Sequence, residues 1–91
     1  MKGLRLFRNG SQLGRIYYYL ASAGGGWRTI EQVSHESGSF AASTKISQVN
    51  ERLKKHGVPE VLENQKRDIG SSKNVSCYRW VDFSEKQGRL L

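Results

Sequence analysis

The chain has 91 residues, of which 36% are hydrophobic and 25% charged, so it is long enough for one small hydrophobic core and too short for two. Fifteen Lys and Arg residues against eight Asp and Glu give a net charge of +7, which favours a polyanionic partner such as nucleic acid. No apolar run approaches the roughly 20 residues that cross a bilayer, and the first residues lack the apolar stretch of a signal peptide, so we expect a cytoplasmic protein without a membrane partner. Cys77 is the only cysteine, which excludes an internal disulfide and a zinc finger.

The positive charge is concentrated towards the amino-terminal end. Residues 1–28 carry five basic residues and no acidic one. Such a segment either contacts phosphates or forms a solvated surface that keeps a small protein in solution. We therefore divide the chain into a basic arm or strand at 1–10, one domain at 11–83 and a short tail at 84–91.

The first predicted helix follows this basic segment. Its apolar positions recur with helical spacing at Leu13, Ile16, Tyr17 and Leu20. Asn9 or Ser11 is available as the amino-terminal cap. The three glycines at 24–26 make continuation of the helix costly, so a loop is expected there.

A short second helix of about two turns is predicted after the glycines. Thr29 and Gln32 have the spacing of a capping box, in which each side chain accepts a hydrogen bond from the other residue's backbone. Val33 would face the core. Gly38 is placed to adopt the left-handed conformation that ends a helix.

The third predicted helix has the clearest pattern in the chain. Ile46, Val49 and Leu53 form one apolar stripe, with Ala42 beside it, and a cluster of basic residues precedes a stop at Gly57. Ser39 or Ser43 is expected to cap its start. A length of about three to four turns follows from this pattern.

After Pro59 the pattern changes to that of strands. Residues 60–66 and 75–83 are rich in β-branched and aromatic side chains, and residues 67–74 between them are rich in Asp, Gly, Ser and Asn. These features predict a two-stranded hairpin with a long polar tip. Trp27 and Trp80 are expected in the core, fastening the sheet to the helices.

This order of elements resembles the winged helix-turn-helix superfamily over residues 11–83. The resemblance rests on 29–33 as the first helix of the motif, 36–38 as its turn and 43–57 as its second helix. Within the superfamily the chain is most similar to small proteins of phages and prophages. The resemblance implies an α+β fold, with a three-helix core and a C-terminal two-stranded β-hairpin wing. It also implies a transcriptional regulator of phage, prophage or plasmid type that binds specific sequences of double-stranded DNA.

In the docking geometry of that superfamily, the second motif helix lies in the major groove and the wing contacts the backbone. The face of this helix opposite the apolar stripe carries Thr44, Gln48, Glu51, Arg52 and Lys55, with Lys45 and Ser47 on its flanks. The resemblance therefore implies DNA contacts by Thr44, Lys45, Ser47, Gln48, Arg52 and Lys55 from the helix, and by Lys66, Arg67 and Lys73 from the wing. The alternative for both sets is an ordinary solvated surface.

Two further features leave alternatives open. Glu51 either accepts a hydrogen bond from a cytosine amino group or repels phosphate. Tyr17 belongs to the apolar stripe of the first helix, whereas Tyr18 points outward beside Arg15, where it serves equally well as a homodimer contact or a nucleic-acid contact.

The sequence does not predict an enzyme, a cofactor, a metal site or a small-molecule substrate. His35, Glu36, His56 and Cys77 lack partners at the spacing that nucleophilic catalysis or metal binding needs, and no phosphate-binding glycine loop is present. The histidines are expected at helix ends and Cys77 as a small buried residue. The alternative to a DNA-binding regulator is a protein-interaction adaptor or inhibitor, or an RNA-binding module, with the same fold.

Overall fold

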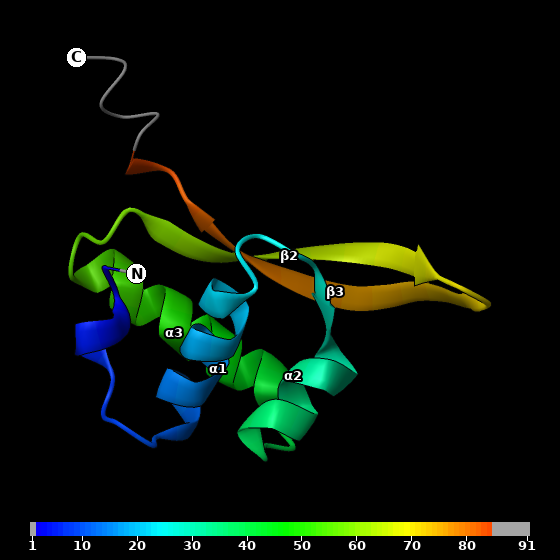
Figure 1. Cartoon of the computed structure of the whole chain (residues 1–91), viewed down its shortest axis with the longest axis horizontal. Coiled ribbons are helices and arrows are strands. Elements are labelled where there is room, and N and C mark those ends of the chain that lie inside the picture. The colour runs from blue at the N-terminus through cyan, green and yellow to red at the C-terminus, as the bar shows by residue number, and fades with distance from the viewer. Residues whose placement is uncertain (1, 85–91) are drawn as a thin grey trace.

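The computed structural model describes residues 2–84, which form an α+β fold of three helices and a three-stranded antiparallel sheet. In chain order the elements are a 3₁₀ turn η1 (Leu4–Leu6), α1 (Gln12–Ser22), β1 (Arg28–Thr29), α2 (Ile30–Ser37), α3 (Ala42–Lys55), β2 (Glu60–Ile69) and β3 (Ser72–Asp82). The helices lie on one side of the sheet, and the far half of the β2–β3 hairpin extends well past them (Figure 1). None of the helices within residues 2–84 has the length and apolar character needed to cross a membrane. The predicted tail from residue 85 onward lies outside the described residues.

Helix α1 begins and ends as the sequence predicts. The Ser11 side chain is its cap and accepts a hydrogen bond from the backbone N–H of Gly14 at 3.1 Å. Of the predicted apolar stripe, Ile16, Tyr17 and Leu20 are fully inaccessible to solvent and Leu13 is partly buried. The helix stops before the three glycines, of which Gly24 has a φ of 62°.

Helix α2 also has its predicted boundaries. The backbone N–H of Gln32 donates to Thr29 Oγ1 at 3.1 Å, and the backbone N–H of Thr29 donates to Gln32 Oε1 at 2.8 Å. This is the predicted capping box. Gly38 ends the helix with a φ of 69°, a left-handed conformation that favours glycine.

Helix α3 buries the predicted stripe, but the prediction of its cap is wrong. Ala42, Ile46, Val49 and Leu53 all lie in the core. The cap position is Ala41, without a side-chain hydrogen bond, and Ser43 lies inside the helix. Ser39 is buried and accepts a hydrogen bond from the Ala41 backbone N–H at 3.2 Å, so it orders the turn before the helix.

The sheet has three strands where the sequence predicts two. Strand β1 pairs with β3, with Arg28 opposite Tyr78 and Thr29 opposite Cys77. A two-residue strand is too short to show the alternation by which strands are recognised in a sequence. The prediction of a long polar tip is also wrong, because β2 and β3 pair as far as Ile69 and Ser72 and leave a turn of two residues. Gly70 opens that turn with a φ of 58°, as a tight hairpin requires.

The amino-terminal segment forms neither the predicted arm nor a strand. After η1 the chain packs on the helices, and Phe7 is only 8% exposed, with its ring 5.3 Å from that of Tyr17. A side chain at Gly3 would collide with Leu53, so glycine allows the close approach. Gly3 and Phe7 are therefore buried against the core, whereas Leu4, Arg5 and residues 8–10 stay exposed.

The two tryptophans differ in position. Trp80 packs against the core as predicted. Trp27 is half-buried outside the core cluster, and the guanidinium carbons of Arg67 and Arg79 lie 5.0 and 4.7 Å from its ring centroid. Arg79 follows Tyr78, which faces the core, so alternation along β3 places Arg79 on the sheet face away from the helices. Trp27 thus fastens the loop before β1 to the hairpin.

Candidate nucleic-acid interface

Helix α3 presents a polar ridge along its solvent side. Opposite the buried stripe, the exposed side chains are those of Thr44, Ser47, Gln48, Glu51, Arg52 and Lys55. The sequence places Ser47 on a flank, but it is exposed with the others. Lys45 is half-buried on a flank, as predicted. Hydroxyl, amide and charged groups therefore follow one another along this side of the helix.

A polar groove of about 290 Å³ separates the ridge from the hairpin. Its walls come from α3 and from the near half of β2 and β3, and its lining residues are Ser43, Thr44, Ile46, Ser47, Asn50, Leu62, Asn64 and Tyr78. Figure 1 shows α3 running beneath the hairpin from which these strands come.

Asn50 fixes the helix against the hairpin. Its Oδ1 accepts a hydrogen bond from the Leu62 backbone N–H at 2.8 Å, and its Nδ2 donates to the Leu62 carbonyl at 3.0 Å. The sequence analysis missed this residue. The one signal was a polar amide close to the apolar stripe of a helix, on the flank between buried and exposed positions.

A second groove, of about 270 Å³, lies on the other side of the ridge. It runs between the start of α1 and the carboxy-terminal half of α3, and is lined by Leu13, Gln48, Glu51, Arg52, Lys55 and His56. The ridge of α3 thus has a groove along each side.

Arg52 is exposed, as the sequence predicts, but its guanidinium leans towards the amino-terminal segment. Its guanidinium donates to the Leu6 carbonyl at 3.3 Å and lies 5.4 Å above the centroid of the Phe7 ring. These contacts turn the side chain towards the amino-terminal segment. The physical reason is that an exposed guanidinium next to an aromatic face gains a cation–π interaction that a fully solvated one lacks.

The basic side chains of the hairpin divide between two faces. Lys66 shares a face with Leu62 and Asn64, which is the helix side, and its Nζ donates to Ser76 Oγ at 2.7 Å. Arg67 belongs to the opposite face, and its guanidinium donates to Gln65 Oε1 at 3.0 Å. Lys73 is exposed near the turn. The structure therefore brings Lys66 to the side of α3 but not Arg67.

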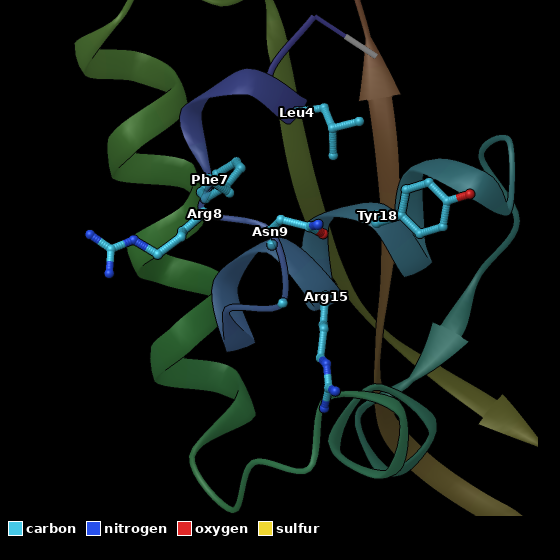
Figure 2. A pocket seen from close by; sticks show the side chains of 8 residues that line it. Leu4, Phe7, Arg8, Asn9, Arg15 and Tyr18 are labelled. Carbon is cyan, nitrogen blue, oxygen red and sulfur yellow. The ribbon is translucent and has the colours of Figure 1, made fainter.

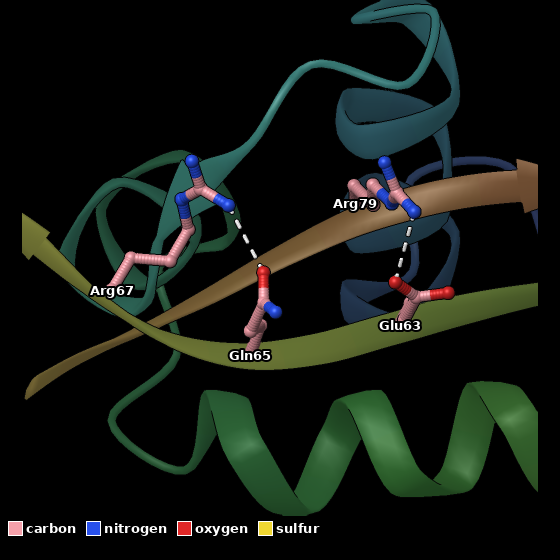
Figure 3. Close-up of polar contacts among 4 residues, drawn as sticks. All are labelled: Glu63, Gln65, Arg67 and Arg79. Carbon is pink, nitrogen blue, oxygen red and sulfur yellow. Dashed lines mark hydrogen bonds and ion pairs between the residues drawn. The ribbon is translucent and has the colours of Figure 1, made fainter.

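The outer face of the hairpin carries polar pairs of its own. Arg79 forms an ion pair with Glu63 at 3.0 Å, next to the bond between Arg67 and Gln65. Figure 3 shows these pairs on the side of the strands away from α3. Both guanidinium groups also contact the Trp27 ring. The two arginines of this face are therefore held by neighbouring side chains.

A pocket of about 490 Å³ lies between the amino-terminal segment and α1. Figure 2 shows its labelled lining residues, Leu4, Phe7, Arg8, Asn9, Arg15 and Tyr18. Leu4 is 41% and Tyr18 54% exposed, so apolar surface reaches solvent here. The prediction that Tyr18 points outward beside Arg15 is confirmed.

The residues that invite catalytic or metal chemistry are scattered. His35 lies in the last turn of α2, His56 follows the last residue of α3, and Cys77 is fully buried in β3. Within residues 2–84, no three His, Cys, Asp or Glu side chains are grouped in a way that could hold a metal ion.

Comparisons with known proteins give no family for this chain. No family model matches it, and neither a curated protein nor a solved structure does. The features that bear on its function are therefore the ridge of α3, the grooves beside it and the distribution of charge.

Proposed function

We propose that the protein binds specific sequences of double-stranded DNA as a small winged helix-turn-helix regulator. Helix α3 would enter the major groove, with the β2–β3 hairpin against the sugar-phosphate backbone as the wing. The observation that carries the proposal is the polar ridge of α3, which is exposed along its length and has a groove on each side. The net charge of +7 supports an anionic partner.

The amino-terminal half of the ridge supplies the groups suited to reading bases. Thr44 and Ser47 carry hydroxyls that pair with several base edges, and the amide of Gln48 matches adenine. Glu51 would accept a hydrogen bond from a cytosine amino group. Lys55, at the end of the helix, would reach guanine or a phosphate.

The hairpin supplies contacts that do not depend on sequence. Lys66, on the helix side of β2, and Lys73, near the turn, are exposed. The far half of the hairpin extends past the helices (Figure 1). Both ammonium groups would contact phosphates next to the bound groove. Arg67 contributes positive charge to the hairpin but is engaged with Gln65 and Trp27.

A second function, binding of another copy of the chain, is supported by the surface around Tyr18. Arg15 and Glu36 line one pocket of about 460 Å³ together with Tyr18, so this surface carries both signs of charge. A twofold interface over this surface would allow Arg15 of one copy to pair with Glu36 of the other, and vice versa. A dimer of this kind would present two α3 ridges to a two-part DNA site.

Titration of the purified protein against random-sequence duplex DNA, single-stranded DNA and structured RNA at two salt concentrations tests the proposed function. We expect tightest binding to the duplex, with affinity falling steeply as salt rises. A preference for RNA would favour the RNA-binding alternative. Absence of binding to all three nucleic acids at low salt would contradict the proposal and favour a protein-interaction module.

A further inference from the structure

The basic amino-terminal segment, remote from α3 in the sequence, lies against it in the fold. Arg52 of α3 holds it there through the Leu6 carbonyl and the Phe7 ring. Phe7 is itself fixed, because it is buried and stacks on Tyr17. The backbone at residues 6–7 is therefore anchored beside the flank of α3 that faces away from the hairpin.

Arg8 directly follows this anchored pair and is exposed. In Figure 2 its side chain extends from beside Phe7 on the side of α3, whereas Arg15, which lines the same pocket, extends in a different direction, towards α2. Arg52, which holds the amino-terminal segment, also lines the groove between α1 and α3. The exposed Arg8 therefore directly follows the two residues, Leu6 and Phe7, that Arg52 joins to α3.

We propose that Arg8 contacts the DNA backbone on the side of α3 opposite the hairpin, and that Arg52 is a positioning residue that holds the segment there. This inference rests on the proposed function. Phosphate is the chemistry that fits, because guanidinium groups bind it through parallel hydrogen bonds and residues 1–28 contain no acidic side chain to compete. The duplex is then held on both sides of α3, by Lys66 and Lys73 on one and by Arg8 on the other.

The salt dependence of binding to a random-sequence duplex tests the contact by Arg8. Each phosphate contact contributes about 0.9 to the slope of log K against log salt concentration. We expect Arg8→Ala to lower the slope by about that amount. Arg5→Ala is the matched control, because it removes the same charge from an exposed position of η1 to which no DNA or protein contact is assigned, and its slope should equal that of the unaltered protein. An unchanged slope for Arg8→Ala, or equal losses in both variants, would overturn the inference.

The positioning role of Arg52 is tested by combining Arg52→Ala with Arg8→Ala. If Arg52 acts through Arg8, each single variant and the double variant lose the same slope, about that of one phosphate contact. If Arg52 touches a phosphate itself, the double variant loses about twice as much. If it reads a base, Arg52→Ala weakens binding to a selected target sequence while binding to random duplex is unchanged. Either of the last two results would overturn the positioning role.

Failure of this inference is distinguishable from failure of the proposed function. If the unaltered protein shows no salt-dependent duplex binding, the proposed function itself is wrong. If the unaltered protein binds duplex DNA and Arg8→Ala leaves the salt slope unchanged, the proposed contact by Arg8 is wrong. The proposed contacts by α3 and the hairpin are not affected by that result. Thermal melting of each variant confirms that the compared proteins are folded.

Discussion

Glu60 shows how a single residue joins distant parts of this fold. Its carboxylate is buried and accepts hydrogen bonds from the Tyr17 hydroxyl, from Trp80 Nε1 at 3.1 Å and from the Lys2 backbone N–H at 2.8 Å. A buried carboxylate is tolerated only when its oxygens are satisfied in this way. The donors come from the amino-terminal segment, α1 and β3, so the group links three elements to β2.

Replacement of Tyr17 by Phe should destabilise the protein. The change removes a donor to Glu60 and leaves the Gly3 backbone N–H, which donates to the Tyr17 hydroxyl at 3.1 Å, without its acceptor. We expect a loss of about 1–3 kcal/mol in the free energy of unfolding, measured by urea denaturation. Tyr18→Phe removes the same atom from an exposed ring and should change stability by less than about 0.5 kcal/mol. Equal effects of the two changes would refute the buried network.

Alkaline pH should destabilise the fold through the same residue. Burial raises the pKa of Tyr17, the hydrogen bond to Glu60 raises it further, and burial also raises the pKa of Tyr78. Phenols of the unfolded chain lose their protons near pH 10, while the folded state keeps them, so the stability present below about pH 10 is lost above it. Urea denaturation at several pH values should show a smaller alkaline loss for Tyr17→Phe. Parallel curves for the two proteins would contradict this assignment.

At the scale of elements, the helices could be predicted from the sequence, but the contacts between elements could not. Periodicity and caps are local, so Ser11, the capping box at Thr29 and the stop at Gly38 could be located from the sequence. Strand β1 exists only because β3 pairs with it. The contacts of Asn50 with Leu62 and of Arg52 with Leu6 join residues far apart in sequence, and no periodic pattern encodes them. For this reason the ridge could be predicted, whereas the contact that turns the Arg52 guanidinium towards Leu6 could not.

Loss of the Asn50 amide should loosen α3 from the hairpin. Asn50→Ala leaves the backbone N–H and carbonyl of Leu62 without their side-chain partners. We expect a cost of about 1–3 kcal/mol in the free energy of unfolding. Ser47→Ala, one turn earlier on the exposed side, is the control and should cost less than about 0.5 kcal/mol. A fully stable Asn50→Ala protein would show that core packing alone sets the angle between helix and hairpin.

The two kinds of proposed DNA contact should respond differently to mutation. Gln48→Ala should weaken binding to a selected target by about 1–3 kcal/mol and relax preference at one base pair. Lys73→Ala should weaken binding to all duplexes alike and lower the salt slope by about one. Competition binding with selected and random duplexes separates the two effects. Equal losses on both duplexes for Gln48→Ala would remove this residue from base recognition.

At the scale of the whole molecule, charge and shape divide the surface into distinct regions. The ridge of α3 lies between the hairpin and the amino-terminal segment, and both carry exposed basic side chains. The outer sheet face pairs its arginines with Glu63, Gln65 and Trp27. The surface around Tyr18 is more apolar and carries both signs of charge. The first of these surfaces is the proposed DNA-binding site, the second stabilises the hairpin, and the third is the proposed contact with another copy of the chain.

We propose that DNA binds across the ridge of α3. Titration with duplex DNA, followed by NMR of the backbone amide chemical shifts, tests this proposal at each residue. If DNA binds there, we expect the shift changes to occur at the exposed positions of α3, at Lys66 and Lys73 of the hairpin and at Arg8, while the amide shifts of Glu63 and Arg79 on the outer sheet face are unchanged. Shifts confined to the outer sheet face or to the surface around Tyr18, with α3 unaffected, would contradict it.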